Sequence, residues 1–210
     1  VPDAGGRGSP NYPQVRTDAS LYEDDTDFEL RRLTADYVFR PSEDVFGRLS
    51  AGIFEQMYGG VSAEVLWKPV SSRLAFGAEV NYIRRREFDQ LFDFKSMTTV
   101  DPVTGARRTI PDVNGHISAY YDFGNGFHGQ IDAGSYLAGD RGATFSVDRE
   151  FANGWRVGAF ATFTDASFED FGEGSFDKGL RITVPLSTIT NQPSRRENDL
   201  VINSLSRDGG

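Results

Sequence analysis

The 210-residue chain contains no cysteine, which excludes disulfides, thiolate metal sites and thiol nucleophiles. It has no excess of basic residues either: its net charge is -9 and its pI is near 4.7, which argues against a nucleic-acid partner. No apolar run approaches the roughly 20 residues that a transmembrane helix needs. The sequence predicts no cofactor and no metal site.

The chain does contain long segments in which apolar and polar residues alternate. From Trp155 to Phe163 every second residue is apolar, and the residues between are polar or glycine, with Phe160 as the exception. A period of two is typical of a β-strand, because successive side chains point to opposite faces. The same pattern predicts nine strands, at about 28–40, 45–53, 61–67, 74–82, 117–123, 127–133, 143–147, 155–163 and 180–186.

Strand length favours a membrane barrel over a soluble β-sandwich, the alternative for an alternating pattern. Strands of soluble sheets have about 5–6 residues, whereas several segments here alternate over more, with aromatic residues near their ends. We therefore expect an all-β fold: an antiparallel transmembrane β-barrel, or the C-terminal part of one, with about nine or ten strands in this chain. Residues 1–27 are predicted to be irregular, 28–186 to form the strands and 187–210 to be a polar tail.

The connections between the predicted strands are expected to alternate strictly between short turns and long loops, as in bacterial barrels. The short turns are 41–44, 69–72, 124–126 and 151–154, and they are predicted to face the periplasm. The long loops 84–114 and 165–176 are predicted to face the exterior, and 97–110 is predicted to contain a hairpin. Residues 57–60 are predicted to connect two strands.

One face of the predicted strands carries both charges, amides and hydroxyls, as the wall of a water-filled lumen would. Such a lumen could pass a hydrated polymer by many weak contacts, or could be packed with salt bridges around a plug. The candidate lumen-facing residues are Arg32, Asp36, Arg48, Glu64, Lys68, Glu79, Asp122, His128, Gln130, Asp132, Asp148, Arg156 and Arg181.

Two connections also concentrate polar side chains. Acids interleaved with phenylalanines between 165 and 178 resemble the paired carboxylates of glycoside hydrolases, although a solvated loop is the favoured interpretation. His116 and His128 flank the turn at 124–126, where a structural role is favoured over that of a base oriented by Asp122 or Asp132. The loop candidates are Asp140, Arg141, Glu169, Asp170, Glu173, Asp177 and Lys178.

Three blocks of sequence resemble the YjbH family of Gram-negative outer-membrane exopolysaccharide-biosynthesis proteins. They are Tyr-Leu-Ala-Gly-Asp-Arg-Gly-Ala-Thr at 136–144, Arg-Glu-Phe-Ala-Asn-Gly at 149–154 and Phe-Gly-Glu-Gly-Ser-Phe-Asp-Lys-Gly at 171–179. The resemblance implies the C-terminal portion of a longer, non-enzymatic barrel lipoprotein in the cell outer membrane. Its implied partners are outer-membrane lipid, an exopolysaccharide chain, the N-terminal remainder of the same protein and periplasmic secretion components.

Together these observations predict an outer-membrane barrel that supports export or surface assembly of an exopolysaccharide. Two alternatives stay open. One is a membrane-embedded polysaccharide hydrolase that uses the carboxylates between 165 and 177. The other is a non-conducting scaffold barrel for periplasmic partners.

Overall fold

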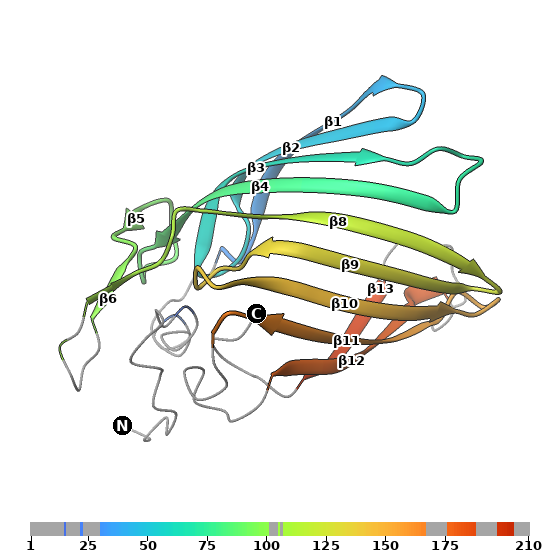
Figure 1. Ribbon diagram of the computed structural model, residues 1–210. Helices are drawn as coiled ribbons and strands as arrows, with labels where there is room; N and C mark the ends of the chain where they lie inside the picture. The colour runs from blue at the N-terminus through green and yellow to red at the C-terminus, as the bar shows by residue number, and fades with distance from the viewer. Residues whose placement is uncertain are drawn as a thin grey trace.

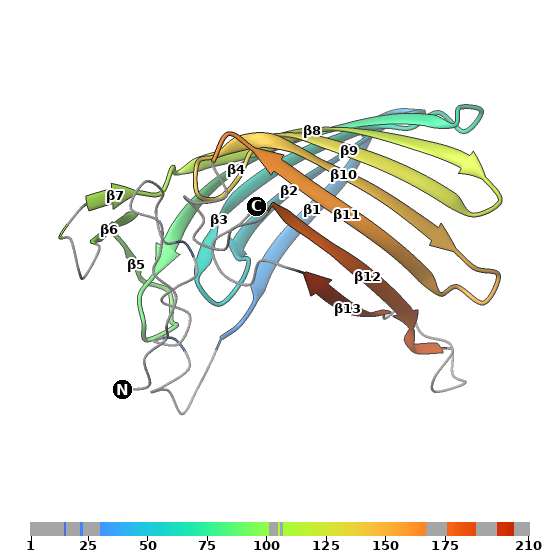
Figure 2. The same ribbon diagram turned by 60° about the horizontal axis from the view of Figure 1, so that its bottom comes forward.

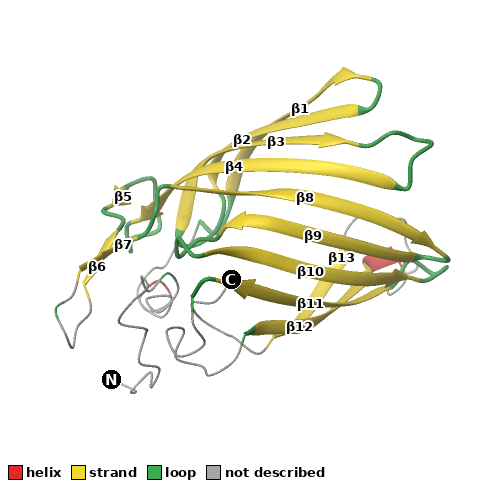
Figure 3. Cartoon of the chain, viewed as in Figure 1, coloured by secondary structure: helices red, strands yellow, loops and turns green. Residues whose placement is uncertain are grey.

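The computed structural model describes residues 15, 22, 30–100, 105, 107–166, 176–187 and 197–203. These residues form one 11-stranded antiparallel sheet and a separate two-stranded hairpin (Figures 1 and 3). The main sheet follows chain order, β1-β2-β3-β4-β8-β9-β10-β11-β12-β13, and the short β5 pairs with β4. The predicted all-β antiparallel architecture is confirmed. In the described part of the chain, no helix has the length and apolar character needed to span a membrane.

Each of the nine predicted strands is present, and the predicted hairpin inside the long connection is formed by β6 and β7. The alternating segments are long enough for several to exceed the usual length of soluble strands. The strands are β1 Leu33–Ser42, β2 Val45–Ile53, β3 Tyr58–Trp67, β4 Leu74–Arg86, β5 Phe94–Lys95, β6 Thr98–Val100, β7 Arg107–Thr109, β8 Val113–Gly124, β9 Phe127–Ser135, β10 Arg141–Glu150, β11 Arg156–Thr164, β12 Asp177–Pro185 and β13 Glu197–Asn203.

Two expectations need correction. The segment predicted to be a polar tail contains β13, which pairs with β12 from Gly179↔Asn203 to Pro185↔Glu197 and raises the strand number above the nine or ten expected. The sheet is also open: its pairing runs from β1 to β13, and within the described residues these two end strands do not pair with each other. Figure 2 shows the result, a strongly curved arch with two strand edges and no closed barrel.

The strands' connections gather at two ends of the arch. The turn end holds the connections at 43–44, 68–73, 125–126 and 151–155, and the loop end holds those at 54–57, 87–112 and 136–140 (Figure 1). Strict alternation of short and long connections is wrong, because 54–57 and 136–140 are themselves short.

Glycine is required both at a tight turn and where two strands approach closely. Asn125 and Gly126 have φ values of 56° and 79°, the positive angles that a two-residue hairpin turn requires. Gly52 and Gly60 pair across β2 and β3, and an added Cβ would lie 2.1 Å from the Leu33 carbonyl oxygen or 2.0 Å from that of Tyr82. Only glycine fits where the backbones approach this closely. Because it pairs with Gly52, Gly60 belongs to β3 and not to the connection predicted at 57–60.

The sheet has one apolar face and one polar face. Cross-strand register aligns the apolar positions into continuous rows, for example Leu49↔Ala63↔Val80 and, further along the sheet, Ile131↔Phe145↔Ala161. Their large side chains are not covered: Ile117 is 69% exposed, and most of the others are about half exposed. The apolar face is therefore the outside of the arch, and within the described residues no buried apolar cluster lies beneath the strands.

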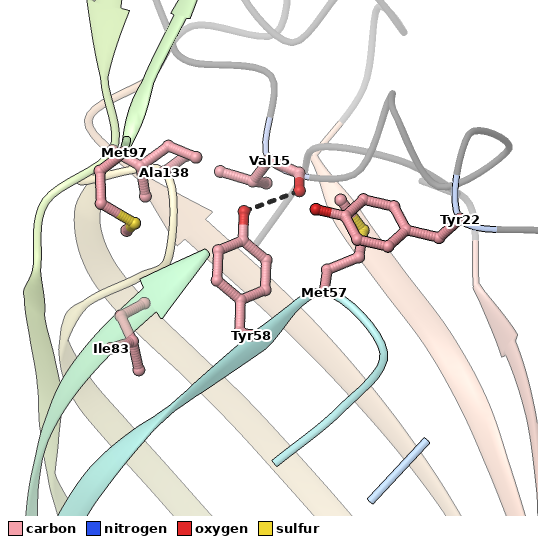
Figure 4. Packing of buried hydrophobic residues seen from close by; sticks show 8 residues of the cluster. Val15, Tyr22, Met57, Tyr58, Ile83, Met97 and Ala138 are labelled. Atoms are coloured by element: carbon pink, nitrogen blue, oxygen red, sulfur yellow. Dashed lines mark hydrogen bonds between the residues drawn. The ribbon is translucent and has the colours of Figure 1, made fainter. Parts of the chain in front are cut away.

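A compact apolar core does form at the loop end. Its buried side chains come from Val15 and Tyr22 before β1, from the 54–57 connection, and from the ends of β3, β4 and the loops that follow (Figure 4). The Tyr58 hydroxyl donates a hydrogen bond of 2.9 Å to the Val15 carbonyl oxygen, which ties the early chain to β3. The core consists of Val15, Tyr22, Met57, Tyr58, Ile83, Met97, Ile110 and Ala138.

Candidate functional site

The polar face collects the residues predicted to face a lumen. All of them except Arg32 and Lys68 lie within strands, and the register places the strand residues on the face that lacks the apolar rows, with Glu64 between Arg48 and Glu79. Arg32 immediately precedes β1 and Lys68 immediately follows β3. The strand residues are Asp36, Arg48, Glu64, Glu79, Asp122, His128, Gln130, Asp132, Asp148, Arg156 and Arg181.

Hydroxyl groups on this face are buried and donate across strands. Ser118 donates to Asp132 at 2.6 Å, and the hydroxyls of Thr144 and Thr162 are 2.8 Å apart. Thr183 in β12 donates to Asp199 in β13 at 2.5 Å. Ser118, Thr162 and Thr183 are each less than a tenth exposed. Polar side chains are thus packed and hydrogen-bonded where a soluble protein would place aliphatic ones.

Ion pairs on the same face stay accessible to water. Arg48 and Glu64 lie 2.6 Å apart, with 48% and 36% of their side chains exposed. Arg156 and Glu197 are 3.8 Å apart and join β11 to β13 across β12. This is a mixed-charge, water-accessible surface.

The polar face is hollowed near the turn end. The hollow has a volume of about 390 Å³ and lies over β3, β4, β8, β9 and β10. It combines an aromatic ring with an amide, an imidazole and charges of both signs. Its lining residues are Glu64, Leu66, Lys68, Arg73, Ala75, Tyr120, Tyr121, Asp122, His128, Gly129, Gln130 and Asp148.

The loop candidates that the structure describes lie in different environments. Asp177 is the first residue of β12 and is buried opposite Thr162, so its assignment to a loop is wrong: β12 begins three residues earlier than the alternation indicated. Lys178 points to the other face and lies 4.3 Å over the Phe176 ring. Glu169, Asp170 and Glu173 lie outside the described residues, so the paired-carboxylate hypothesis stays a prediction.

Asp140 and Arg141 occupy opposite environments: Asp140 ends the short connection before β10, whereas Arg141 is the first residue of β10, so its assignment to a loop is wrong. Arg141 is exposed and its backbone N–H donates to the Asp165 carboxylate at 2.8 Å. Asp140 is completely buried, and neither carboxylate oxygen has a hydrogen-bond partner within the described residues. Burial away from water raises the pKa of the Asp140 carboxyl above its usual value.

Tyr136 begins the same connection and folds back over the polar face. Its hydroxyl lies 2.6 Å from the Thr144 hydroxyl, and its ring contacts the His116 ring edge-on at 4.6 Å. Burial raises the pKa of the Tyr136 phenol. The block at 136–144 therefore joins a folded-back connection to the start of β10.

His128 lies opposite Asp122 in the register and both line the hollow, so the base–orienter hypothesis stays a prediction there, whereas His116 lies beside a different carboxylate. His116 Nδ1 lies 3.4 Å from the Glu79 carboxylate on the neighbouring strand, and His128 lies in the hollow near the turn end. In the described part of the chain, no three His, Asp or Glu side chains gather closely enough to hold a metal ion.

Sequence reasoning missed Arg86, the most extensively hydrogen-bonded side chain of the loop end. It is 0% exposed and donates to the carbonyl oxygens of Leu30, Gln56 and Leu91 at 2.9–3.0 Å, and also to that of Gln90. The one available signal was the run of three arginines at 84–86, which ends β4 where the alternation weakens.

A family model described as exopolysaccharide biosynthesis protein YbjH matches residues 3–210 of the chain. The uncharacterized lipoprotein YjbH of Escherichia coli (strain K12) is 34% identical over 202 residues, which cover 95% of this chain. These residues are 27% of that relative, so the chain spans about a quarter of its length. No solved structure matches. The length of the family match and the identity to this relative show that the chain belongs to the YjbH family of exopolysaccharide biosynthesis proteins.

Proposed function

We propose that the arch is a wall of an outer-membrane β-barrel whose polar face lines a passage for an exopolysaccharide during its export or surface assembly. The role is non-catalytic: the chain contacts the polymer and breaks no bond in it. The family description supplies the polymer, and the relative's lipoprotein name supports attachment to a membrane.

The observation that best supports this proposal is that the apolar side chains of the sheet are exposed while polar ones are buried. Soluble monomers rarely expose contiguous apolar patches beyond a few hundred Å², yet the outside of this arch is apolar from β1 to β13. Moving a half-exposed Leu, Val or Phe from water into hydrocarbon gains about 1 kcal/mol. Lipid therefore stabilises this face, while the polar face keeps contact with water.

An aromatic belt at the turn end supports the membrane assignment. The rings of Trp67 and Phe76 stack at 5.9 Å, and those of Tyr121 and Phe123 meet edge-on at 4.9 Å. Arg149 lies 4.9 Å from the ring of Phe127 and equally far from that of Phe151. Aromatic girdles of this kind mark the membrane–water interfaces of transmembrane barrels.

The polar face suits a sliding polymer because its groups are numerous and none dominates. Hydroxyls, amides and mixed charges offer many weak hydrogen bonds, each worth about 0.5–1.5 kcal/mol net. A hydrated chain can exchange such bonds one at a time as it moves.

In hydrocarbon the free edges of β1 and β13 need strand partners, since each unpaired backbone group costs several kcal/mol. We propose that strands from the longer protein supply them.

Thiol labelling of whole cells tests both membrane insertion and its direction. Single cysteines are placed in the full-length protein at Asn153, in the turn end, and at Asp93, in the loop end. A membrane-impermeant maleimide should label Asp93→Cys in intact cells and Asn153→Cys only after the outer membrane is opened. Equal labelling of both positions in intact cells would exclude a spanning arch, and the reverse pattern would exclude the proposed direction.

Transport is tested separately with purified full-length protein. Planar bilayers should show ion conductance that falls when a polymer of the cell's own exopolysaccharide is added. The hydrolase alternative requires cleavage of that polymer, with loss of cleavage in Glu169→Gln or Glu173→Gln. Absence of conductance and of polymer block would leave the scaffold alternative.

A further inference from the structure

We infer that the hollow near the turn end of the polar face binds a hexose unit of an uncharged saccharide, with the Tyr120 ring as its stacking surface. This inference rests on the proposed function and assigns a place of contact within it. The volume of about 390 Å³ falls in the range of small-molecule pockets, roughly 300–1,000 Å³.

The Tyr120 ring lies close against the sheet because the residues beneath it, Gly77 and Ala75, are small. A Cβ added to Gly77 would lie 3.3 Å from Cε2 and 3.4 Å from the hydroxyl of Tyr120, so the ring extends over this glycine. Tyr120 is opposite Ala75 in the register, and Ala75 is only 1% exposed. The ring is supported on the sheet side and partly exposed on the other. An aromatic ring so placed offers an apolar surface to the C–H face of a sugar ring.

Polar groups around the ring are fixed before any ligand binds. The Gln130 amide nitrogen donates to both carboxylate oxygens of Asp132 at 2.8 Å, which orients the amide carbonyl as an acceptor. Asp122 accepts the Gly124 backbone N–H at 2.8 Å. The Asp148 carboxylate lies directly over Gly158, where an added Cβ would overlap it. Such prepositioned planar acceptors pair with sugar hydroxyls at little entropic cost.

The charge of the hollow favours an uncharged sugar over an anionic one. Its lining includes three carboxylates, on Glu64, Asp122 and Asp148, against the two cations Lys68 and Arg73. Glu64 is also paired with Arg48, so the charges in and around the hollow balance and offer a uronate no net attraction. Carboxylates and cations both bond well to neutral hydroxyl groups, as donors or acceptors.

Saturation-transfer NMR on the full-length protein in detergent tests the inference. The probes are two neutral oligosaccharides, maltoheptaose and cellohexaose, and one anionic oligosaccharide, heptagalacturonate. Saturation should pass to the ring C–H protons of at least one neutral probe, and heptagalacturonate should bind more weakly. Tyr120→Ala should weaken binding about five- to tenfold, by the worth of an aromatic contact. Tyr120→Phe should retain most of the affinity, and Gln130→Ala should lose about threefold.

Tyr37→Ala is the matched control, because Tyr37 is an aromatic residue of the apolar face and is 65% exposed. It should leave saccharide binding unchanged, and heat-modifiable migration in gels checks that every variant is folded. The inference is overturned if the unmutated protein binds neither neutral probe, if Tyr120→Ala binds as the unmutated protein does, or if heptagalacturonate binds most tightly. Conductance of the same preparation separates the two proposals: conductance without saccharide binding refutes only the hollow, and binding without conductance refutes only the passage.

Discussion

The loop end and the strand body of this chain are stabilised in opposite ways. The loop end resembles a small soluble domain, with an apolar core around Tyr58 and a buried Arg86 that gathers carbonyl groups from three segments. In the described part of the strand body the large apolar side chains face outward, and the buried side chains are mostly hydroxyls, together with those of Ala75 and Asp177. Hydrogen bonds between neighbouring strands stabilise it instead, and under the proposed function lipid covers its apolar face. The same chain therefore responds to substitution by two different rules.

Replacing Arg86 should have the largest effect, because it breaks the loop end from within. Arg86→Met leaves the carbonyl oxygens of Leu30, Gln56 and Leu91 buried without this donor, and we expect a loss of about 3–5 kcal/mol in the free energy of unfolding. Denaturant titration in detergent measures it. Arg84→Met is the control, since Arg84 is 40% exposed and pairs with Asp112 at 3.5 Å. Equal losses in both variants would refute the special role of Arg86.

The neighbours Ala63 and Ser62 test the strand body, because their side chains occupy opposite faces of β3. Ala63 lies in the row Leu49↔Ala63↔Val80, and Ser62 lies between Ser50 and Asn81. An arginine at the lipid-facing midplane costs about 2–4 kcal/mol, so Ala63→Arg should reduce the folded fraction in liposomes. Ser62→Arg should change it little. A larger loss from Ser62→Arg would reverse the assignment of the two faces.

Asp140 gives the loop end a pH dependence of its own. Burial raises its folded-state pKa above the usual 3.8, so folding disfavours the carboxylate. The loop end is consequently most stable below the unfolded pKa and loses stability as pH rises through the window up to the raised folded pKa. Asp140→Asn should remove this decline and raise the thermal midpoint at pH 7 but not at pH 3. Asp93→Asn, at an exposed carboxyl of the loop end, is the control. A midpoint for Asp140→Asn below that of the parent at pH 7 contradicts the prediction.

The Arg48–Glu64 pair should show the smallest effect, because water reaches both side chains. Glu64→Gln should lower the free energy of unfolding by less than about 1 kcal/mol, as for other exposed ion pairs. Arg48→Gln and the double variant complete the cycle and isolate the pair's own contribution. A coupling above about 2 kcal/mol would mean that the polar face is shielded from water, which favours a plugged lumen over an open one.

Local pattern predicted the strands better than it predicted their limits. The alternation from Trp155 to Phe163 places β11 correctly because a period of two reflects backbone geometry. β13 was not predicted because its only apolar residues, Leu200, Val201 and Ile202, are consecutive and do not alternate. Its strand structure depends on pairing with β12. Asp177 was assigned to a loop for the same reason: its place in β12 is set by the partner Thr162 on β11.

The candidate residues divide in the same way. Those of the polar face were predictable since each follows from its parity within one strand. Arg86 was not, because its carbonyl partners lie up to 56 residues away in sequence. The hollow around Tyr120 was not either, since it combines residues of β3, β4, β8, β9 and β10 through their register.

By itself, the sequence determined that this chain forms long antiparallel strands with one apolar and one polar face, because alternation acts residue by residue along the backbone. Only the tertiary structure decided that the sheet is an open arch, that the loop end is closed around Arg86 and that Asp140 is buried. Those features depend on contacts between segments far apart in the chain, and their free energies appear only once the strands have brought the segments together.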